Sequence, residues 1–248
     1  MLGGKIKLLI SGAAALDAKI EEKYRALGLN LVQGYGLTET SPVVAVGTNR
    51  YHKVGTIGKT LPSVEVKLED KNQEGIGELL VKGPNIMLEY FEDRKATKEA
   101  IKDGWFHTGD LAKVDEEGYI TICGRKKSVI VLKNGKNIFP EEMENLVNKI
   151  EGVSESFIFG KQQSEDENDI KINVKIVLDK EVIKQVYKVE KEEEIREIMA
   201  KQIKEINQTM PRYKAIRGVI LTEEPLIKTT TNKIKRQENL AMILKNKE

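Results

Sequence analysis

The segment 34–42, GYGLTETSP, gathers an aromatic ring, hydroxyls and a carboxylate that could together serve a nucleotide. Tyr35 has a glycine on each side, so no neighbouring side chain would prevent its ring from lying against a flat base. Thr38 can donate a hydrogen bond to a phosphate oxygen, and Glu39 offers the hard oxygen ligands that Mg²⁺ takes. The alternative is an ordinary turn with Tyr35 in the core and Glu39 in solvent, because Gly, Ser, Thr and Pro also make loops.

Three later segments carry groups that suit sugar and phosphate oxygens. Asp110 ends HTGD and could accept hydrogen bonds from both ribose hydroxyls, and Arg125 in GRKK has fixed, always-charged donors. Lys233 in TTTNKIKR could bring positive charge to a phosphate or a reacting carboxylate from a flexible polar loop. The alternatives are a turn-forming Asp110, a surface ion pair for Arg125 and a basic tail around Lys233. For His107 a structural role is favoured over that of a general base.

The composition excludes several functional classes. The 248 residues carry a net charge of +2, which makes no general case for nucleic acid or an anionic membrane surface. A single cysteine, Cys123, allows no internal disulfide and favours a reduced, cytoplasmic compartment, and two histidines without clustered Cys or His argue against a zinc site. No run reaches the roughly 18–20 apolar residues of a membrane span, which leaves only peripheral membrane contact open. The apolar N-terminus is interpreted as a buried strand rather than a signal peptide.

The first third of the chain predicts a βαβ unit. A strand is expected at 5–11, an amphipathic helix at 16–27 and a second strand at 29–36. This order predicts a parallel sheet, in which ligands bind beyond the carboxyl ends of the strands. The turns SGAA and QGYG follow the two strands directly, so we expect them to line one crevice.

The rest of the chain predicts two further regions. Residues from about 54 to 124 have the short alternating strands of a small β-subdomain, with DEEG at 115–118 as a hairpin turn. Pro140 begins a predicted helix, and the acidic run 164–169 is interpreted as a solvated loop. After these come predicted strands at 153–160, 170–178 and 216–222, a charged helix at about 190–207 and a polar basic tail.

The domain boundary is predicted at GRKK, which is too short and too basic for a flexible tether. We expect residues 1–125 to form one part and residues 126–248 a second, with a short hinge between them. The unit 128–248 has its own core pattern and should fold independently. If residues 1–125 lack the rest of an α/β layer, a strand edge and apolar surface along 5–11 and 29–46 should be exposed.

Taken together, six segments resemble the adenylate-forming (AMP-binding) acyl-CoA synthetases, a family that includes luciferases and the adenylation domains of peptide synthetases. The block 103–144 is highly specific for this family, and ETSPVVAV with KNGKNIFPEE looks most like the long-chain fatty-acid–CoA ligases. The six segments extend from about residue 10 to residue 236: SGAAAL, QGYGLTETSPVVAV, VGTIGKTLPSVEVK, GELLVKGPNIMLEYF, DGWFHTGDLAKVDEEGYITICGRKKSVIVLKNGKNIFPEEMENLV and TTTNKIKR.

The resemblance implies a fold and a reaction. The fold would be α/β plus α+β: the tail end of an adenylating-enzyme large domain, followed by a small mobile C-terminal domain that swings about Lys127. The reaction would join a fatty acid or other carboxylate to ATP, releasing pyrophosphate, and then pass the acyl group to coenzyme A with release of AMP. Mg²⁺ would accompany the nucleotide.

The resemblance also implies roles for particular residues of the first part. Tyr35 would stack on adenine, Thr38 would touch the α-phosphate and Glu39 would bind Mg²⁺. The residues that would form the walls beside the adenine are Gly12, Ala13, Ala14 and Gly34.

Further roles fall on later segments. Asp110 and Arg125 would hold the ribose. Lys233 would assist adenylate formation by steadying charge between the carboxylate and the α-phosphate. Gly135 would lie on the loop that lines the coenzyme A channel in the thioester-forming state.

Two departures from the family pattern bear on activity. Asn232 stands where the family usually has a glycine before the catalytic lysine, although asparagine tolerates left-handed conformations better than most residues. Nothing in the chain resembles the Ser/Thr/Gly-rich phosphate loop that family members carry upstream, and Met1 falls past the midpoint of such an enzyme. The chain therefore resembles the C-terminal half of a synthetase that needs its N-terminal half, and we expect it to be inactive or nearly so alone.

Two other functions remain open. The chain could adenylate another carboxylate, such as an aryl or amino acid that is handed to a carrier-protein thiol. It could instead be a degenerate module that binds a nucleotide or a partner protein without chemistry, but the presence of Lys233 with Glu39, Asp110 and Arg125 argues against degeneracy.

Overall fold

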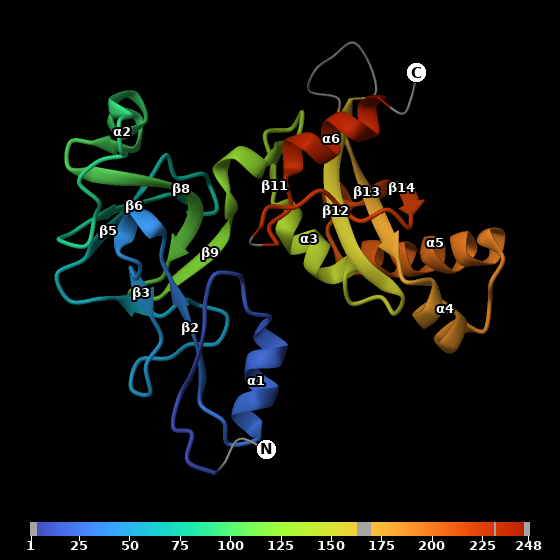
Figure 1. Ribbon diagram of the computed structural model, residues 1–248, viewed down its shortest axis with the longest axis horizontal. Helices are drawn as coiled ribbons and strands as arrows, with labels where there is room; N and C mark the ends of the chain where they lie inside the picture. Colours follow the sequence, from blue (N-terminus) through green and yellow to red (C-terminus); the bar gives the residue numbers. More distant parts are fainter. Residues whose placement is uncertain (1–3, 163–169, 231, 246–248) are drawn as a thin grey trace. The chain divides into compact units, whose positions relative to one another are not determined.

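The structure is a computed structural model that describes residues 4–162, 170–230 and 232–245 (Figure 1). It divides into two compact units, Met1–Lys127 and Ser128–Glu248, which are described separately. Within the described residues, every helix is too short or too polar to cross a lipid bilayer.

The first unit begins with the predicted βαβ arrangement. β1 pairs with β2 in parallel, and α1 connects them, with the Asp17 side chain accepting hydrogen bonds from the backbone amides of Lys19 and Ile20 at its N-terminus. β1 is shorter than the predicted 5–11. The elements of this four-stranded sheet and its connections are β1 (Leu9–Ser11), α1 (Ala18–Ala26), β2 (Leu31–Tyr35), η1 (Thr38–Thr40), β3 (Ala45–Val46) and β4 (Lys59–Thr60), in the order β1-β2-β3-β4.

A five-stranded β-rich sheet follows, as the short alternating strands predict. The DEEG hairpin is confirmed, because the Asp115 carboxylate accepts from the backbone amides of Glu117 and Tyr119 between β8 and β9. A short helix, α2, was not predicted, because none of its residues is buried and it has no apolar periodicity. The elements are β5 (Glu65–Glu69), β6 (Gly77–Lys82), α2 (Arg94–Ala100), β7 (Ile101–Lys102), β8 (Trp105–Val114) and β9 (Ile120–Arg125), followed by η2 (Lys126–Ser128).

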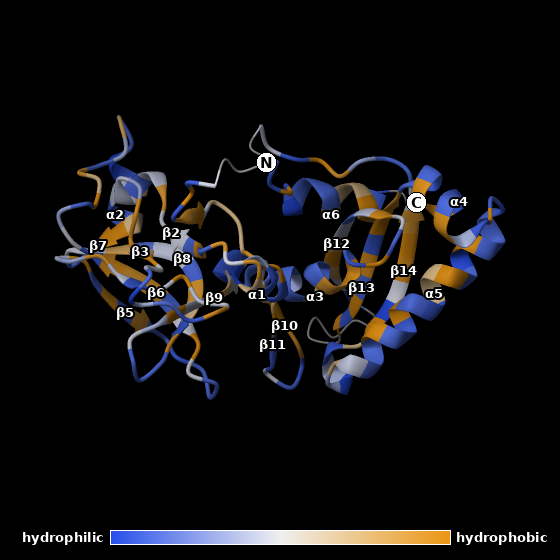
Figure 2. Ribbon diagram, turned by 90° about the horizontal axis from the view of Figure 1, so that it is seen from below, coloured by the Kyte–Doolittle hydropathy of each residue, from blue (hydrophilic) through white to orange (hydrophobic). Residues whose placement is uncertain are grey.

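The second unit is a three-stranded sheet with helices on both faces. β13 lies in the middle, antiparallel to β12 and parallel to β14. One apolar cluster joins the sheet to α3 and α5, and another joins the opposite face to α6, so apolar residues concentrate inside the unit (Figure 2). The elements are β10 (Ile130–Val131), β11 (Asn137–Ile138), α3 (Pro140–Val147), β12 (Val153–Gln162), β13 (Ile170–Leu178), α4 (Lys180–Tyr187), α5 (Glu192–Thr209), η3 (Arg212–Lys214), β14 (Ile216–Thr222) and α6 (Arg236–Lys245).

The predicted basic tail is wrong in part, because residues 236–245 of it form the helix α6. Only Asn239 and Ile243 of this helix are buried, so its apolar stripe is too narrow to stand out in the sequence. Ile243 packs against Phe157, Phe159 and Val177 of the sheet, and Asn239 hydrogen-bonds Ile227 and Lys235 in the preceding segment, so tertiary contacts hold this helix. The helix α4 was also not predicted, and the acidic run 164–169 lies outside the described residues.

Apolar side chains are exposed at the start of the first unit, as expected for residues 5–11. Ile10 is 61% exposed on the edge strand β1, and Leu27 at the end of α1 is 77% exposed. The same expectation for 29–46 is wrong, because Val32 and Val44 are fully buried. The reason is that β2 has a partner strand on each side, whereas β1 lies at an edge of the sheet.

We predict that the chain self-associates through this edge. Replacing Ile10 or Leu27 with lysine should shift light scattering at high protein concentration toward the monomer, because charge opposes edge-to-edge pairing and shrinks the apolar patch. Val186→Lys, which changes an exposed apolar side chain on α4, is the matched control and should have no effect. A monomeric unsubstituted chain would contradict the prediction.

Candidate functional site

The carboxylate of Asp110 lies at the centre of a hydrogen-bond network in the first unit. Asp110 is 4% exposed, and its Oδ2 accepts a hydrogen bond from the hydroxyl of Tyr35 at 2.5 Å. Its Oδ1 accepts from Nε of Arg125 at 2.8 Å, and Nη1 of the same arginine donates to the carbonyl of Thr108 at 3.2 Å. The structure thus brings Tyr35 of β2 and Arg125 of β9 onto the carboxylate of Asp110 on β8. In the sequence these two residues lie 75 and 15 positions away from Asp110.

The local backbone explains why Asp110 points inward. Alternate residues of β8 are buried, and Asp110 is opposite Arg125 in the β8–β9 register. Gly109 has φ +70°, a left-handed conformation that a glycine adopts without strain, next to a register irregularity between β6 and β8. The Thr108 hydroxyl donates to the carbonyl of Leu79 at 2.7 Å and accepts from the amide of Asp110 at 3.0 Å. Thr108 was missed in the sequence, where nothing distinguishes it from an ordinary turn residue.

Burial and charge keep Tyr35 in its protonated form. Burial raises the pKa of the Tyr35 phenol well above its ordinary value, and the adjacent Asp110 carboxylate raises it further. The ring packs against the apolar cluster of the first unit while its hydroxyl donates to Asp110. Tyr35 is therefore partly a core residue, and its hydroxyl fixes where the ring lies.

The two glycine-rich turns lie side by side, as expected at the carboxyl ends of parallel strands. A Cβ placed on Gly12 would be 3.7 Å from the carbonyl oxygen of Gly34, and Gly12, Ala13 and Ala14 are all exposed. Gly36 permits a close approach, because a Cβ there would be 1.7 Å from the carbonyl oxygen of Pro42. The segment after β2 therefore folds back tightly on itself, and the turn at 12–14 is exposed while residues 34–36 are half-buried.

Glu39 lies in η1 and is held by residues from a later loop. Its Oε1 accepts from the hydroxyl of Tyr90 at 2.9 Å, and its backbone carbonyl accepts from the amide of Met87 at 2.8 Å. Asn85 donates to the carbonyls of Thr40 and Val43 and so holds the same segment. Oε2 of Glu39 accepts no hydrogen bond from the described residues, so a half-buried carboxylate oxygen is available for a cation. This arrangement fits Mg²⁺, which commonly takes one or two protein carboxylates.

Thr38 is exposed beside Glu39 in the same 3₁₀ turn. Tyr90, like Asn85, was missed in the sequence, because its contact spans 51 residues and no spacing signals it. A tyrosine or an asparagine in a loop can have many roles, so only the folded structure shows that Tyr90 and Asn85 hold the Glu39 segment in place.

A second group of possible metal ligands lies away from Glu39. Among the described residues, Glu69, Glu78 and His107 place ligand atoms within 4.8 Å of one another. However, Lys126 Nζ lies 2.7 Å from Glu78 Oε2, and the other Glu78 oxygen accepts from the amide of Gly109. A lysine ammonium already compensates this carboxylate, which agrees with a structural role for His107.

The remaining predicted residues lie at the end of the first unit and in the second. Lys127 is exposed at the last position of the first unit, and Gly135 is exposed in the turn between β10 and β11. Lys233 is exposed in a turn that the Lys228–Ile234 bridge closes. Asn232 has φ +61°, so it adopts the left-handed conformation that glycine would otherwise provide.

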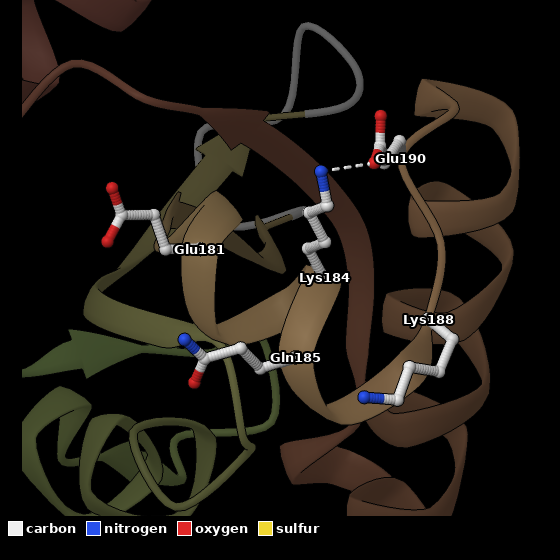
Figure 3. A pocket seen from close by; sticks show the side chains of 5 residues that line it. All are labelled: Glu181, Lys184, Gln185, Lys188 and Glu190. Carbon is white, nitrogen blue, oxygen red and sulfur yellow. Dashed lines mark ion pairs between the residues drawn. The ribbon is translucent and has the colours of Figure 1, made fainter.

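A hollow between α4 and the following loop is a poor alternative site (Figure 3). Five polar side chains line it, and its Lys184 is already paired with Glu190 at 2.5 Å. It contains none of the residues that the sequence analysis singled out, which are instead found around Asp110, Glu39 and Lys233. The lining residues are Glu181, Lys184, Gln185, Lys188 and Glu190.

Comparison with known families gives two matches along the chain. Residues 1–91 match the model of the AMP-binding enzyme family, and residues 127–243 match that of the AMP-binding enzyme C-terminal domain. The two matches follow each other in the same order as the two units of the structure.

Similar curated proteins are coenzyme A ligases. The long-chain-fatty-acid–CoA ligase FadD15 of Mycobacterium bovis is 42% identical over 159 residues, which are 64% of this chain and 26% of that protein. The indoleacetate–CoA ligase of Aromatoleum aromaticum is 34% identical over 163 residues, 63% of this chain and 32% of that protein. The aligned part of the chain thus spans about a quarter to a third of the length of these relatives.

A solved structure has the same fold over nearly the whole chain. It is the O-succinylbenzoate coenzyme A synthetase (MenE) of Bacillus subtilis in complex with ATP and a magnesium ion. Its TM-score is 0.78 at 27% identity, and the match covers 96% of this chain and 47% of that one. The two units, the α/β layer with its β-rich sheet and the α+β unit, therefore have the fold of an adenylating enzyme.

We predict that two tyrosines of the first unit ionise late. Burial and the Glu39 carboxylate raise the pKa of Tyr90 to about 12, and the pKa of Tyr35 is raised as well. Because a raised pKa favours the neutral phenol in the folded state, its contribution to stability is complete below the unfolded value of about 10 and is lost as pH rises through the folded value.

An ultraviolet titration of phenolate, with urea unfolding at each pH, measures this effect. Tyr90→Phe should remove a late-ionising group and weaken the fall in stability above about pH 10. The control Tyr51→Phe, at a 45% exposed tyrosine, should leave the late step in place. A titration of Tyr90→Phe that keeps the full late amplitude would show that Tyr90 is not held by Glu39.

Proposed function

This chain belongs to the AMP-binding enzyme family, and from that premise we propose that it is the C-terminal part of an ATP-dependent long-chain fatty-acid–CoA ligase. In the first half-reaction a carboxylate oxygen attacks the α-phosphorus of ATP, and the bond to the bridging oxygen breaks to release pyrophosphate. In the second, the coenzyme A thiol loses its proton and its sulfur attacks the acyl carbonyl, which releases AMP. A cytoplasmic location goes with this proposal, as a prediction from the single cysteine.

The first unit would bind the nucleotide. Tyr35 would offer a ring face to adenine while its hydroxyl, bound to Asp110, prevents the ring from turning. Asp110 and Arg125 would hold the ribose, the carboxylate as an acceptor and the guanidinium as a donor. Gly12, Ala13, Ala14 and Gly34 would form the adjoining walls.

The same unit would steady the phosphates. Thr38 would donate to the α-phosphate. Glu39 would bind Mg²⁺ through its available oxygen, and the ion would offset negative charge on the phosphates when bound. Tyr90 would keep the Glu39 carboxylate in one orientation by donating to its other oxygen.

The second unit would serve both half-reactions. Lys233 would place its ammonium between the carboxylate and the α-phosphate, where negative charge moves during adenylation. Lys127 would be the hinge, and Gly135 would lie on the loop that lines the coenzyme A channel. The proposed ligase needs a phosphate loop, which nothing in this sequence resembles, so we expect the chain alone to be inactive or nearly so.

The Tyr35–Asp110–Arg125 network carries the proposal. It gathers a ring, a buried carboxylate and a guanidinium next to the glycine-rich segment that follows β2, and these are the groups that a nucleoside needs. The relatives' names support a carboxylate activated for coenzyme A rather than for a carrier protein.

A second substrate class has its own support. The indoleacetate–CoA ligase and the O-succinylbenzoate coenzyme A synthetase act on aryl acids by their names, and both are similar to this chain. An aryl acid is therefore the alternative substrate, and a substrate panel separates the two.

The test is a chimera in which this chain replaces the corresponding region of the Mycobacterium bovis relative. The chimera should release pyrophosphate with ATP, Mg²⁺ and palmitate, and the isolated chain should not. No turnover with palmitate or with an aryl acid would overturn the enzymatic proposal and favour a non-catalytic module. Robust turnover by the isolated chain would overturn its dependence on a second part.

We predict that Lys233→Ala in the chimera separates the two half-reactions. Adenylation should fall by about 100-fold or more, as when a group that stabilises transition-state charge is removed. Thioester formation from preformed acyl-adenylate should be largely retained. Lys188→Ala, at an exposed lysine of the same unit, is the control. Equal losses in both half-reactions would contradict the role given to Lys233.

A further inference from the structure

Lys233 is exposed at the closing end of a turn, and the chain on both sides of this turn is held by polar side chains. Asn239, 2% exposed on α6, accepts from the amide of Ile227 at 3.1 Å and donates to its carbonyl at 2.9 Å. The same side-chain amide donates to the carbonyl of Lys235 at 2.9 Å. One buried residue therefore holds both ends of the turn.

A carboxylate on the sheet also holds the segment that enters the turn. Glu155 on β12 accepts from the amide of Leu226 at 3.1 Å and forms an ion pair with Lys228. The turn between these ends is closed by hydrogen bonds between Thr229 and Lys233. The backbone is therefore restrained on both sides, and the Lys233 side chain is exposed.

The strongest attachment is a two-bond ion pair at the start of α6. Arg236 donates through Nη1 to Oε1 of Glu144 at 2.9 Å and through Nη2 to Oε2 at 2.6 Å. Glu144 lies on α3, is 6% exposed, and also accepts from the amide of Ile158 on β12 at 2.8 Å. Arg236 thus ties the segment three residues after Lys233 to a helix and a strand at once.

The two parallel bonds between Arg236 and Glu144 fix the orientation of the start of α6 as well as its position. The guanidinium plane matches the carboxylate edge, so the two parallel bonds restrict rotation in a way that a lysine ammonium could not. Burial raises the pKa of the Glu144 carboxyl, and the Arg236 charge opposes that rise. Glu141 adds a second carboxylate to the arginine at 3.2 Å.

We propose that Arg236 is a positioning residue for Lys233: its two-bond pair with Glu144 fixes the start of α6 and so the direction in which the turn presents the lysine. This inference rests on the proposed function of Lys233. A flexible four-carbon side chain can place its ammonium reproducibly only if its backbone is held, and misplacement by about 1 Å can cost about 100-fold in rate. Arg236 is therefore needed for adenylate formation and dispensable for thioester formation.

The first experiment uses the chain as it is. Hydrogen exchange of Arg236→Ala and Arg236→Lys should accelerate by about 10-fold or more at the amides of Ile227, Lys233 and Lys235, because the turn opens locally. The amides of α5 should keep their protection. The control is Lys214→Ala, which removes a 2.6 Å ion pair to Glu142 on the same helix α3 and should leave the turn unchanged.

Two exchange results would overturn the inference. Unchanged exchange in the turn would show that Arg236 does not hold it. An equal rise in α5 for both variants would show that the pair stabilises the whole unit rather than directing one turn.

The second experiment uses the chimera. Arg236→Ala should lower kcat for adenylation by about 100-fold with KM for ATP within about twofold, and thioester formation from preformed acyl-adenylate should stay within about twofold. Added guanidinium should restore part of the adenylation lost in Arg236→Ala and none of that lost in Lys233→Ala. Full adenylation in Arg236→Ala, or equal loss of both half-reactions, would overturn the inference. Failure of the unsubstituted chimera would instead count against the proposed function, and hydrogen exchange would still decide whether Arg236 directs the turn.

Discussion

The buried carboxylate of Asp110 is the interaction on which the first unit depends. An ionised carboxylate with so little exposure is costly unless donors satisfy its oxygens, and here Tyr35 and Arg125 do so. Because Tyr35 ends β2 and Arg125 ends β9, this one group ties the four-stranded sheet to the five-stranded sheet. The same contacts hold a ring, a carboxylate and a guanidinium beside the glycine-rich segment that follows β2. Stability and the proposed binding of a nucleotide therefore depend on the same atoms.

The second unit also contains a buried carboxylate that is paired with an arginine. Glu144 is buried and paired with Arg236, and the pair joins α3, β12 and α6. This ion pair lies three residues after Lys233, so the buried charges of Glu144 and Arg236 restrain the backbone that presents the lysine. In both units, then, an arginine neutralises a buried carboxylate, and the residues next to the pair are the candidates for chemistry. Polar groups that are already held in place lose little conformational entropy when a ligand binds.

The sequence predicted the elements that have strong periodicity or strong turn chemistry. The βαβ start, the DEEG hairpin, the helix from Pro140 and the three strands of the second unit were all anticipated from alternation, capping and turn residues. The helices α2 and α6 were not, because few or none of their residues are buried and a narrow apolar stripe gives little signal. The helix α4 was missed although its apolar residues recur at helical spacing. The exposure expected for 29–46 was wrong because pairing on both sides of β2 buries it.

The sequence by itself determined the residue types of the candidate site and their order along the chain: Tyr35, Glu39, Asp110, Arg125 and Lys233, with an asparagine able to take the conformation of a glycine. These are local properties, since a side chain's chemistry and a turn's preference depend on few neighbours. The tertiary structure alone decided which groups support them. Tyr90 reaches Glu39 across 51 residues, and Arg236 reaches Glu144 across 92. Such contacts arise from how sheets and helices pack, and no periodicity in the chain encodes the distance between their partners.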